Sequence, residues 1–98
     1  MSKLRFEWDQ RKAAANKAKH GVTFEAAATA FADEFALFMS DPDHSGAEDR
    51  FVLLGLSSSA RILVVVHTHR EDNDVLRIIS ARRANTRERR QYKEANSP

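Results

Sequence analysis

The 98-residue sequence has no cysteine, two prolines, three glycines and no long hydrophobic run. Without cysteine the chain cannot form a disulfide, a thiolate metal site or a thiol nucleophile. No stretch approaches the roughly 20 apolar residues that a membrane-spanning helix needs, and the N-terminus does not resemble a secretion signal. We therefore expect a cytoplasmic protein that has no contact with a membrane.

What the sequence does contain is enough apolar material for a core. Hydrophobic residues make up 42% of the chain and charged residues 31%, which is typical of a sequence that folds. The length leaves room for one core, so we expect a single domain over residues 1–98.

Alternating and periodic apolar residues predict the secondary structure. Strands are expected at residues 3–8, 35–39, 51–56, 62–66 and 75–81, and helices at 10–20, 24–31 and about 86–94. Asp9 and Gly21 have the residue types of a helix N-cap and C′ position, and Asn85 with Glu88 has the form of a capping box. Residues 41–46 and 68–74 are predicted as a loop and a turn. This order predicts an α+β fold, an antiparallel sheet packed against the N-terminal helices, with a basic helix at the C-terminus.

Charge is sorted along the chain, although the net charge is only +2. Residues 1–21 hold six Lys and Arg against two acids, residues 22–49 hold seven acids and no Lys or Arg, and residues 50–98 hold ten basic residues against five acids. Such sorting is typical of a face that binds a polyanion such as RNA. The alternative is that the acidic middle neutralises the basic ends within the fold.

Arginines of the strand at 75–81 and of the segment after it are the first site candidates. Arg77 lies among apolar residues in mid-strand, so its guanidinium needs an anionic partner, either a ligand phosphate or an acid of residues 22–49. Arg82 and Arg83 follow, and the helix adds Arg87, Arg89, Arg90 and Lys93. This series favours a basic ridge, although a helix face that is simply exposed to solvent would show the same sequence pattern.

Two histidines, His67 and His69, fall on one side of a strand end. A metal site would need a third ligand, such as Asp41, Asp43 or His44. Proton transfer by either imidazole is the other functional possibility, because histidine titrates near neutrality, and a structural role is the third. The sequence contains no Gly-rich phosphate loop and none of the common hydrolase motifs.

Several separated motifs resemble one protein family, the BrnT-type toxins of bacterial type II toxin–antitoxin pairs. The resemblance covers nearly the whole chain and rests on residues 6–9, Lys12, Asn16, residues 19–22, Phe24, residues 43–45, Gly55, residues 77–82, residues 88–89 and Tyr92. It implies a fold similar to the RelE-type ribonucleases, and RNA cleavage that inhibits translation. It also implies a partner, a BrnA-like ribbon-helix-helix antitoxin, and binding of operator DNA only through the toxin–antitoxin complex.

RelE-like chemistry implies no metal and no other cofactor, because the RNA 2′-hydroxyl attacks the adjacent phosphate. The protein then has to orient the chain, stabilise charge and move protons. We expect Arg77 and Arg82 to stabilise the phosphate and His67 to transfer a proton, with Glu88 or Tyr92 as substitutes. The expected contacts to the RNA backbone are a set of basic residues: Lys12, Lys19, Arg83, Arg87 and Arg90.

These assignments assume that the cations of the last strand and helix converge on one phosphodiester. Two alternatives stay open at this point. One is a non-catalytic binding module that acts through its antitoxin and operator DNA. The other is a metal-dependent nuclease that uses His67, His69 and residues 41–44.

Overall fold

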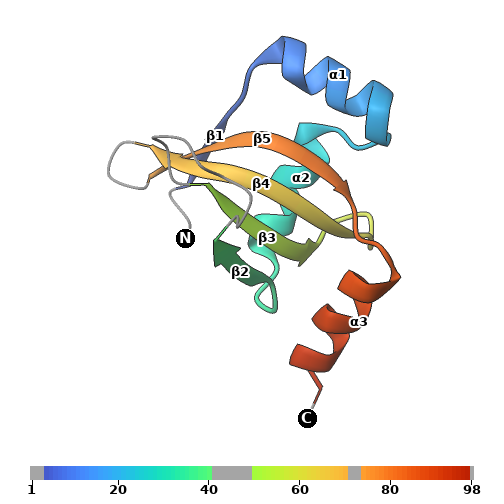
Figure 1. The fold of residues 1–98 in the computed structure, drawn as a ribbon. Helices are drawn as coiled ribbons and strands as arrows, with labels where there is room; N and C mark the ends of the chain where they lie inside the picture. Colours follow the sequence, from blue (N-terminus) through green and yellow to red (C-terminus); the bar gives the residue numbers. More distant parts are fainter. Residues whose placement is uncertain (1–3, 41–49, 71–73, 98) are drawn as a thin grey trace.

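The computed structural model describes residues 4–40, 50–70 and 74–97. Its strands are β1 (Arg5–Glu7), β2 (Leu37–Ser40), β3 (Phe51–Leu56), β4 (Ile62–Arg70) and β5 (Val75–Arg83), which form one sheet in the order β1-β5-β4-β3-β2 (Figure 1). The helices are α1 (Gln10–His20), α2 (Phe24–Thr29), a 3₁₀ turn η1 (Ala30–Ala32) and α3 (Thr86–Ala95). Within the described ranges, no helix is long and apolar enough to cross a membrane.

The helices lie on different sides of this sheet. The larger core cluster joins Phe24 and Ala27 of α2 to Leu53, Val65 and other sheet residues, and Ala13 of α1 packs against it. The smaller cluster joins Leu54 and Val64 to Tyr92 of α3. Because consecutive strand residues point to opposite faces, α1 and α2 cover one face and α3 contacts the other at the end of β5 (Figure 1). We call this second side the α3 face.

The caps confirm the predicted starts of all three helices and the end of α1, whereas the helix predicted at 24–31 ends at Thr29 and continues as the 3₁₀ turn η1. Asp9 accepts hydrogen bonds from the backbone N–H groups of Arg11 and Lys12, and Gly21 ends α1 in the left-handed region at φ 70°. Asn85 and Glu88 form both halves of the capping box at the start of α3. The α+β class is also confirmed, because the structure combines these helices with one five-stranded sheet.

The sheet differs from the prediction in its pairing and in its strand bounds. The structure has β1 at Arg5–Glu7 instead of 3–8, β2 at Leu37–Ser40 instead of 35–39, and β5 extending to Arg83 instead of ending at 81. β1 pairs with β5 in parallel, so one edge of an otherwise antiparallel sheet is reversed. β4 continues through Arg70, although residues 68–70 were expected in a turn. The polar residues at this end of β4 are held in the strand by pairing with β5 from Arg77 to Val75. Backbone hydrogen bonding has outweighed the turn-like composition there.

Gly55 lies where β3 meets the turn η1. A Cβ at this position would fall 2.8 Å from Leu53 Cδ2 and 3.0 Å from the backbone oxygen of Ala30. A side chain would therefore push η1 off the sheet, and only glycine permits this approach.

Asn16 is a buried polar residue that joins α1 to β5. Its Nδ2 donates to the carbonyls of Val22 (2.9 Å) and Ala81 (2.8 Å), and its Oδ1 accepts from the N–H of Ala81 (3.0 Å). The Asn16 side chain thus hydrogen-bonds to both backbone groups of Ala81, the residue directly before Arg82 in β5. Buried backbone groups need such partners.

His67 is a core residue of β4. It is 0% exposed, its Nδ1 lies 3.3 Å from the carbonyl of Val65, and its ring contacts Phe31 edge-on at a centroid distance of 4.8 Å. Its Nε2 is buried and has no partner among the described residues. The pKa of His67 is lowered to about 4, mainly by burial; the hydrogen bond with the Val65 carbonyl opposes this effect, and the electrostatic influence of nearby His69 adds to it.

Replacing Asn16 with Ala should lower the free energy of unfolding by about 3 kcal/mol, because the Val22 carbonyl and both Ala81 backbone groups lose buried partners. Urea unfolding followed by circular dichroism measures this loss. The exposed residue Gln91 supplies the control, since Gln91→Ala should stay within about 0.5 kcal/mol of the parent. Equal effects of the two substitutions would contradict the assigned role of Asn16.

Acid should destabilise the protein through His67. Its folded pKa of about 4 lies below the ordinary 6.5, so between these values the unfolded chain binds a proton that the folded chain does not. Stability from the neutral ring is therefore complete above pH 6.5 and falls as the pH drops toward 4. Between pH 7.5 and 5.0 the parent should lose about 2 kcal/mol more than a His67→Leu variant. Urea midpoints at both pH values test this, and identical losses in the two proteins would refute it.

Candidate nucleic-acid interface

A bulge in β5 decides which way its arginines point. Val66 pairs with Ser80 and His67 pairs with Ile78, so Ile79 is an extra residue in β5. Strict alternation would direct Arg77 and Arg82 to opposite faces. Because of the bulge, both share the α3 face: Arg77 pairs with Thr68, and Arg82 pairs with Val64 of the smaller core cluster.

Arg77 is paired with an acid at the β1 edge of this face. Its Nη1 donates to Glu7 Oε2 at 2.8 Å, and the same oxygen lies 3.4 Å from Nε of Arg70. The partner is therefore Glu7 of β1, and none of the described acids, Glu25, Asp33 and Glu34, of residues 22–40 pairs with Arg77. The Arg77 side chain remains 33% exposed. Glu7 binds two guanidinium groups at once, which leaves this cluster with one excess positive charge.

Arg82 is held by the first turn of α3. Its two terminal nitrogens donate to the two oxygens of Glu88, each at 2.8 Å, and Nη1 also lies 3.3 Å from the carbonyl of Arg83. The Arg82 hydrogen bond lowers the pKa of Glu88, burial opposes this, and the Asn85 N–H lowers the pKa further. The same bond raises the pKa of Arg82. Both groups therefore stay charged.

Arg77 and Arg82 do not form one phosphate-binding pair. Their partners in β4, Thr68 and Val64, are four residues apart, which is about 13 Å at 3.3 Å per residue, and each arginine is bonded to its own carboxylate. A guanidinium has five N–H donors, and the hydrogen bonds of Arg82 to Glu88 and to the carbonyl of Arg83 use three of them. With its side chain 42% exposed, Arg82 keeps two donors for a ligand.

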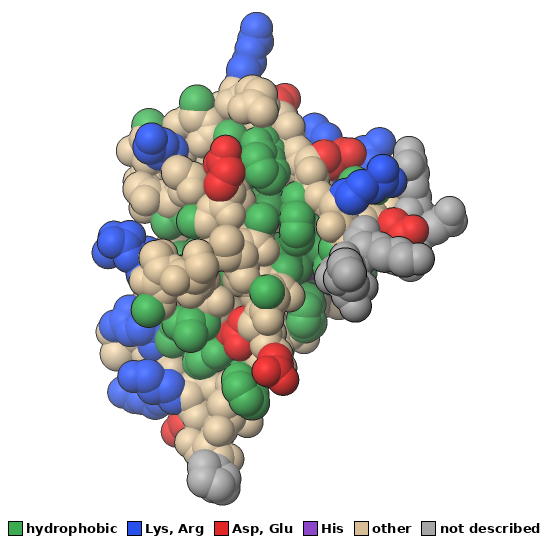
Figure 2. Space-filling view, turned by 180° about the vertical axis from the view of Figure 1, so that it is seen from behind, with side chains coloured by type: hydrophobic (Ala, Val, Ile, Leu, Met, Phe, Trp, Pro, Cys, Tyr) green, Lys and Arg blue, Asp and Glu red, His purple; other side chains and the backbone are tan. Residues whose placement is uncertain are grey.

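Other basic side chains do converge, in a pocket where β5 ends and α3 begins. The pocket has a volume of about 440 Å³ and is lined by four cations and four apolar residues: Arg61, Arg83, Arg89, Lys93, Leu56, Ala60, Ile62 and Ala84. We call it the cationic pocket. Figure 2 shows Lys and Arg side chains along the edge of the molecule that runs toward α3.

The β3–β4 hairpin and α3 hold two of these cations in place. In the hairpin, Ala60 has φ 63°, and Ser57 donates its N–H to the carbonyl of Arg61 at 2.8 Å. This left-handed residue turns the chain directly before Arg61. On α3, Arg89 donates to the carbonyl of Ala84 at 2.7 Å. The pocket walls are thus fixed by backbone hydrogen bonds.

Asp33 holds the other end of α3. Its Oδ2 accepts from the Tyr92 hydroxyl at 2.6 Å and from the N–H of Leu56 at 2.8 Å. Burial would raise the pKa of Asp33, but these bonds and a third from the Phe35 N–H outweigh it and lower the pKa. Burial and the same carboxylate raise the pKa of Tyr92 to about 12, so its hydroxyl stays protonated as a donor. α3 is therefore fixed at both ends.

The residues predicted to contact RNA divide between different surfaces. Arg83 lines the cationic pocket, whereas Arg87 and Arg90 are exposed on α3 and are not part of its lining. Lys12 and Lys19 are exposed on α1, away from α3. Sequence reasoning missed Arg61, whose one local signal is its position directly after a serine-rich turn.

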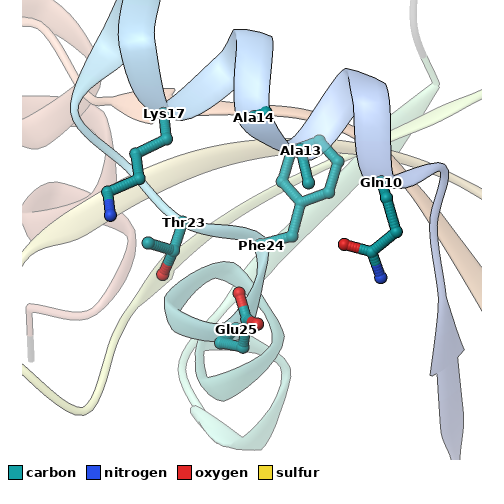
Figure 3. Close-up of a pocket in the computed structure, with 7 residues that line it drawn as sticks. All are labelled: Gln10, Ala13, Ala14, Lys17, Thr23, Phe24 and Glu25. Carbon is teal, nitrogen blue, oxygen red and sulfur yellow. The ribbon is translucent and has the colours of Figure 1, made fainter.

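The groove between α1 and α2 offers a contrast. It measures about 390 Å³ and includes Gln10, Lys17, Thr23 and Glu25 in its lining. In Figure 3, Lys17 and Gln10 lie toward opposite ends of the groove, with Phe24 between them. One cation and one anion line it, so it lacks the charge excess of the cationic pocket.

Little of the predicted histidine site reaches solvent. His67 is buried, and His69, which is exposed, lies 5.5 Å from it between ring centroids. The other suggested metal ligands, Asp41, Asp43 and His44, lie outside the described residues. Among residues 4–40, 50–70 and 74–97, no three His, Asp or Glu side chains are grouped so that they could hold a metal ion.

Comparisons with known proteins agree with this fold. The structure is similar to the 1.1 Å crystal structure of the Brucella abortus ribonuclease toxin BrnT, with a TM-score of 0.57 and 25% identity over 85% of this chain and 99% of that chain. The comparison with curated proteins gives no match. Residues 8–88 match the family described as the ribonuclease toxin BrnT of type II toxin–antitoxin systems. Since this match spans most of the sequence, the chain belongs to the BrnT family of ribonuclease toxins.

Proposed function

We propose that the protein cleaves RNA without a metal ion, by attack of a 2′-hydroxyl on the adjacent phosphate, at the junction of β5 and α3. The 2′-oxygen bonds to phosphorus as it loses its proton to water, and the bond from phosphorus to the 5′-oxygen breaks as that oxygen gains a proton from water. The products are a 2′,3′-cyclic phosphate and a 5′-hydroxyl end. Membership of the family supports ribonuclease activity, and the mechanism is our proposal.

The observation that carries this proposal is the bidentate pair of Arg82 and Glu88. Glu88 fixes the plane of the guanidinium, and two N–H donors of Arg82 remain available to the non-bridging phosphate oxygens. Donors that are held in place before the reaction stabilise developing charge without a cost of reorientation. Arg77, at the β1 edge, is the second candidate for this role, because its side chain is partly exposed on the same face.

Proton transfer is not assigned to His67, Glu88 or Tyr92. His67 was predicted for it, but a fully buried imidazole cannot reach RNA unless this end of β4 opens. Glu88 is ionised and accepts from Arg82, and Tyr92 donates to Asp33. The proposal therefore rests on charge stabilisation and substrate orientation, which both act without a dedicated acid and base.

The biological setting follows from the family. A type II toxin has an antitoxin partner and an RNA target. We place the reaction in the cytoplasm, where loss of RNA would inhibit translation. We further propose that the partner is a BrnA-like ribbon-helix-helix protein, and that operator DNA binds only to the complex of the two.

Cleavage of a single-stranded RNA in excess EDTA tests the mechanism. The parent should cut and leave 5′-hydroxyl ends, whereas Arg82→Gln should cut about 100- to 1,000-fold more slowly, the usual cost of removing a fixed donor. Arg82→Lys keeps the charge but not the planar pair of donors, so it should also be slow. Thermal unfolding of each variant establishes that it is folded.

Two results would contradict this assignment. Activity that disappears with EDTA and returns with a divalent cation would favour the metal-dependent alternative. Full activity of a folded Arg82→Gln variant, with loss in Arg77→Gln, would move the site to the β1 edge of the sheet.

Induction of the protein alone in a bacterial host should arrest growth, because cleavage of RNA inhibits translation. The Arg82→Gln variant, produced at the same level, should arrest growth much less. Incorporation of labelled methionine measures translation directly. Equal arrest by parent and variant would show that toxicity does not depend on Arg82, and would support the non-catalytic binding module.

A further inference from the structure

The cationic pocket is distinguished by the absence of carboxylates. Among the residues that the structure describes, its lining holds four basic side chains and no acid. The described residues offer no ion-pair partner to Arg61, Arg83 or Lys93, and Arg89 donates only to the neutral oxygens of Ala84 and Thr86. Arg77 and Arg82 are neutralised within the fold, but these four cations are not. Their charge is available to an external anion.

The floor of the pocket is apolar. Leu56 remains 39% exposed beside Ile62 and Ala84, at the edge of the smaller core cluster. Cations around an apolar floor match a molecule that carries both a charge and a flat apolar surface. The volume of about 440 Å³ lies within the range of small-ligand sites.

We infer that the cationic pocket binds one nucleotide of single-stranded RNA next to the phosphodiester that is cleaved. Its backbone phosphate lies among Arg61, Arg83 and Lys93, and its base covers Leu56 and Ile62. This inference rests on the proposed RNA cleavage. The two sites adjoin, because Nη1 of Arg82 donates to the carbonyl of Arg83, a residue of the pocket lining.

The floor also defines the class of substrate. A base can cover Leu56 only if it has left a duplex, so double-stranded RNA should bind weakly. Within the described part of the chain, no polar side chain other than the four cations lines the pocket, and these cations provide donors and no acceptors. Base recognition should therefore be tolerant of sequence, as in other sites where contact with the base face dominates.

Binding of a non-cleavable RNA analogue tests the inference separately from catalysis. The probe is a fluorescein-labelled 2′-O-methyl octauridylate, which lacks the attacking hydroxyl. Arg61→Gln and Lys93→Gln should each weaken binding about tenfold and lower the slope of log affinity against log salt by about 0.7. Neither side chain makes a hydrogen bond to a described residue, so folding should be unaffected. Arg11→Gln, an equal charge change at an exposed position of α1, should bind like the parent.

Each alternative predicts a different result. If Arg11→Gln weakens binding as much as Arg61→Gln, the attraction is diffuse and no pocket is involved. Equal affinity for a 2′-O-methyl duplex would contradict the role of the floor. If octaglutamate binds as tightly as the probe, the pocket is a site for acidic peptides.

The two proposals can fail independently. Normal binding by both pocket variants, together with loss of cleavage in Arg82→Gln, would overturn the pocket and keep the proposed reaction. Weakened binding by both variants, with no cleavage by the parent in EDTA, would keep the pocket and overturn the proposed reaction.

Discussion

The carboxylate of Glu88 is the contact on which the proposed site depends. It accepts from the N–H of Asn85 and so completes the cap that begins α3, and it binds both terminal nitrogens of Arg82. One side chain thus fixes the direction in which the helix leaves the strand and the direction of the arginine that precedes it. Loss of Glu88 would leave a partly buried guanidinium without its partner and a helix without half of its cap.

This arrangement divides the cations of the molecule into two groups. Where the sheet has carboxylates, at Glu7 and Glu88, the arginines are paired and their charge organises the fold. Exposed pairs of this kind contribute little to stability, about 0 to 1 kcal/mol each. At the cationic pocket the carboxylates are missing, and the positive charge is directed at solvent. The paired arginines thus orient the strand and the helix around them, and the unpaired cations of the pocket are the ones that we propose to bind a backbone phosphate next to the cleaved one.

Local signals in the sequence predicted the helices well, because Asp9, Gly21 and the pair of Asn85 and Glu88 act over only a few residues. The site was harder to predict. A single extra residue, Ile79, puts Arg77 and Arg82 on the same face of the sheet, and no local sequence pattern predicts this bulge. We expected these two arginines to meet at one phosphate. Instead, Arg77 is bonded to Glu7, which is distant in the sequence, and Arg82 is bonded to Glu88 of the next helix. Arg61 joins the pocket only through the pairing of β3 with β4 and the path of α3.

The central claim is that RNA binds at the junction of β5 and α3. The most direct measurement is a backbone amide NMR titration of the ¹⁵N-labelled protein with 2′-O-methyl octauridylate. The account predicts saturable shifts in residues 60–62 and 82–93, with little change along α1. Shifts confined to the Glu7 and Arg77 edge of the sheet, or to the groove between α1 and α2, would contradict it.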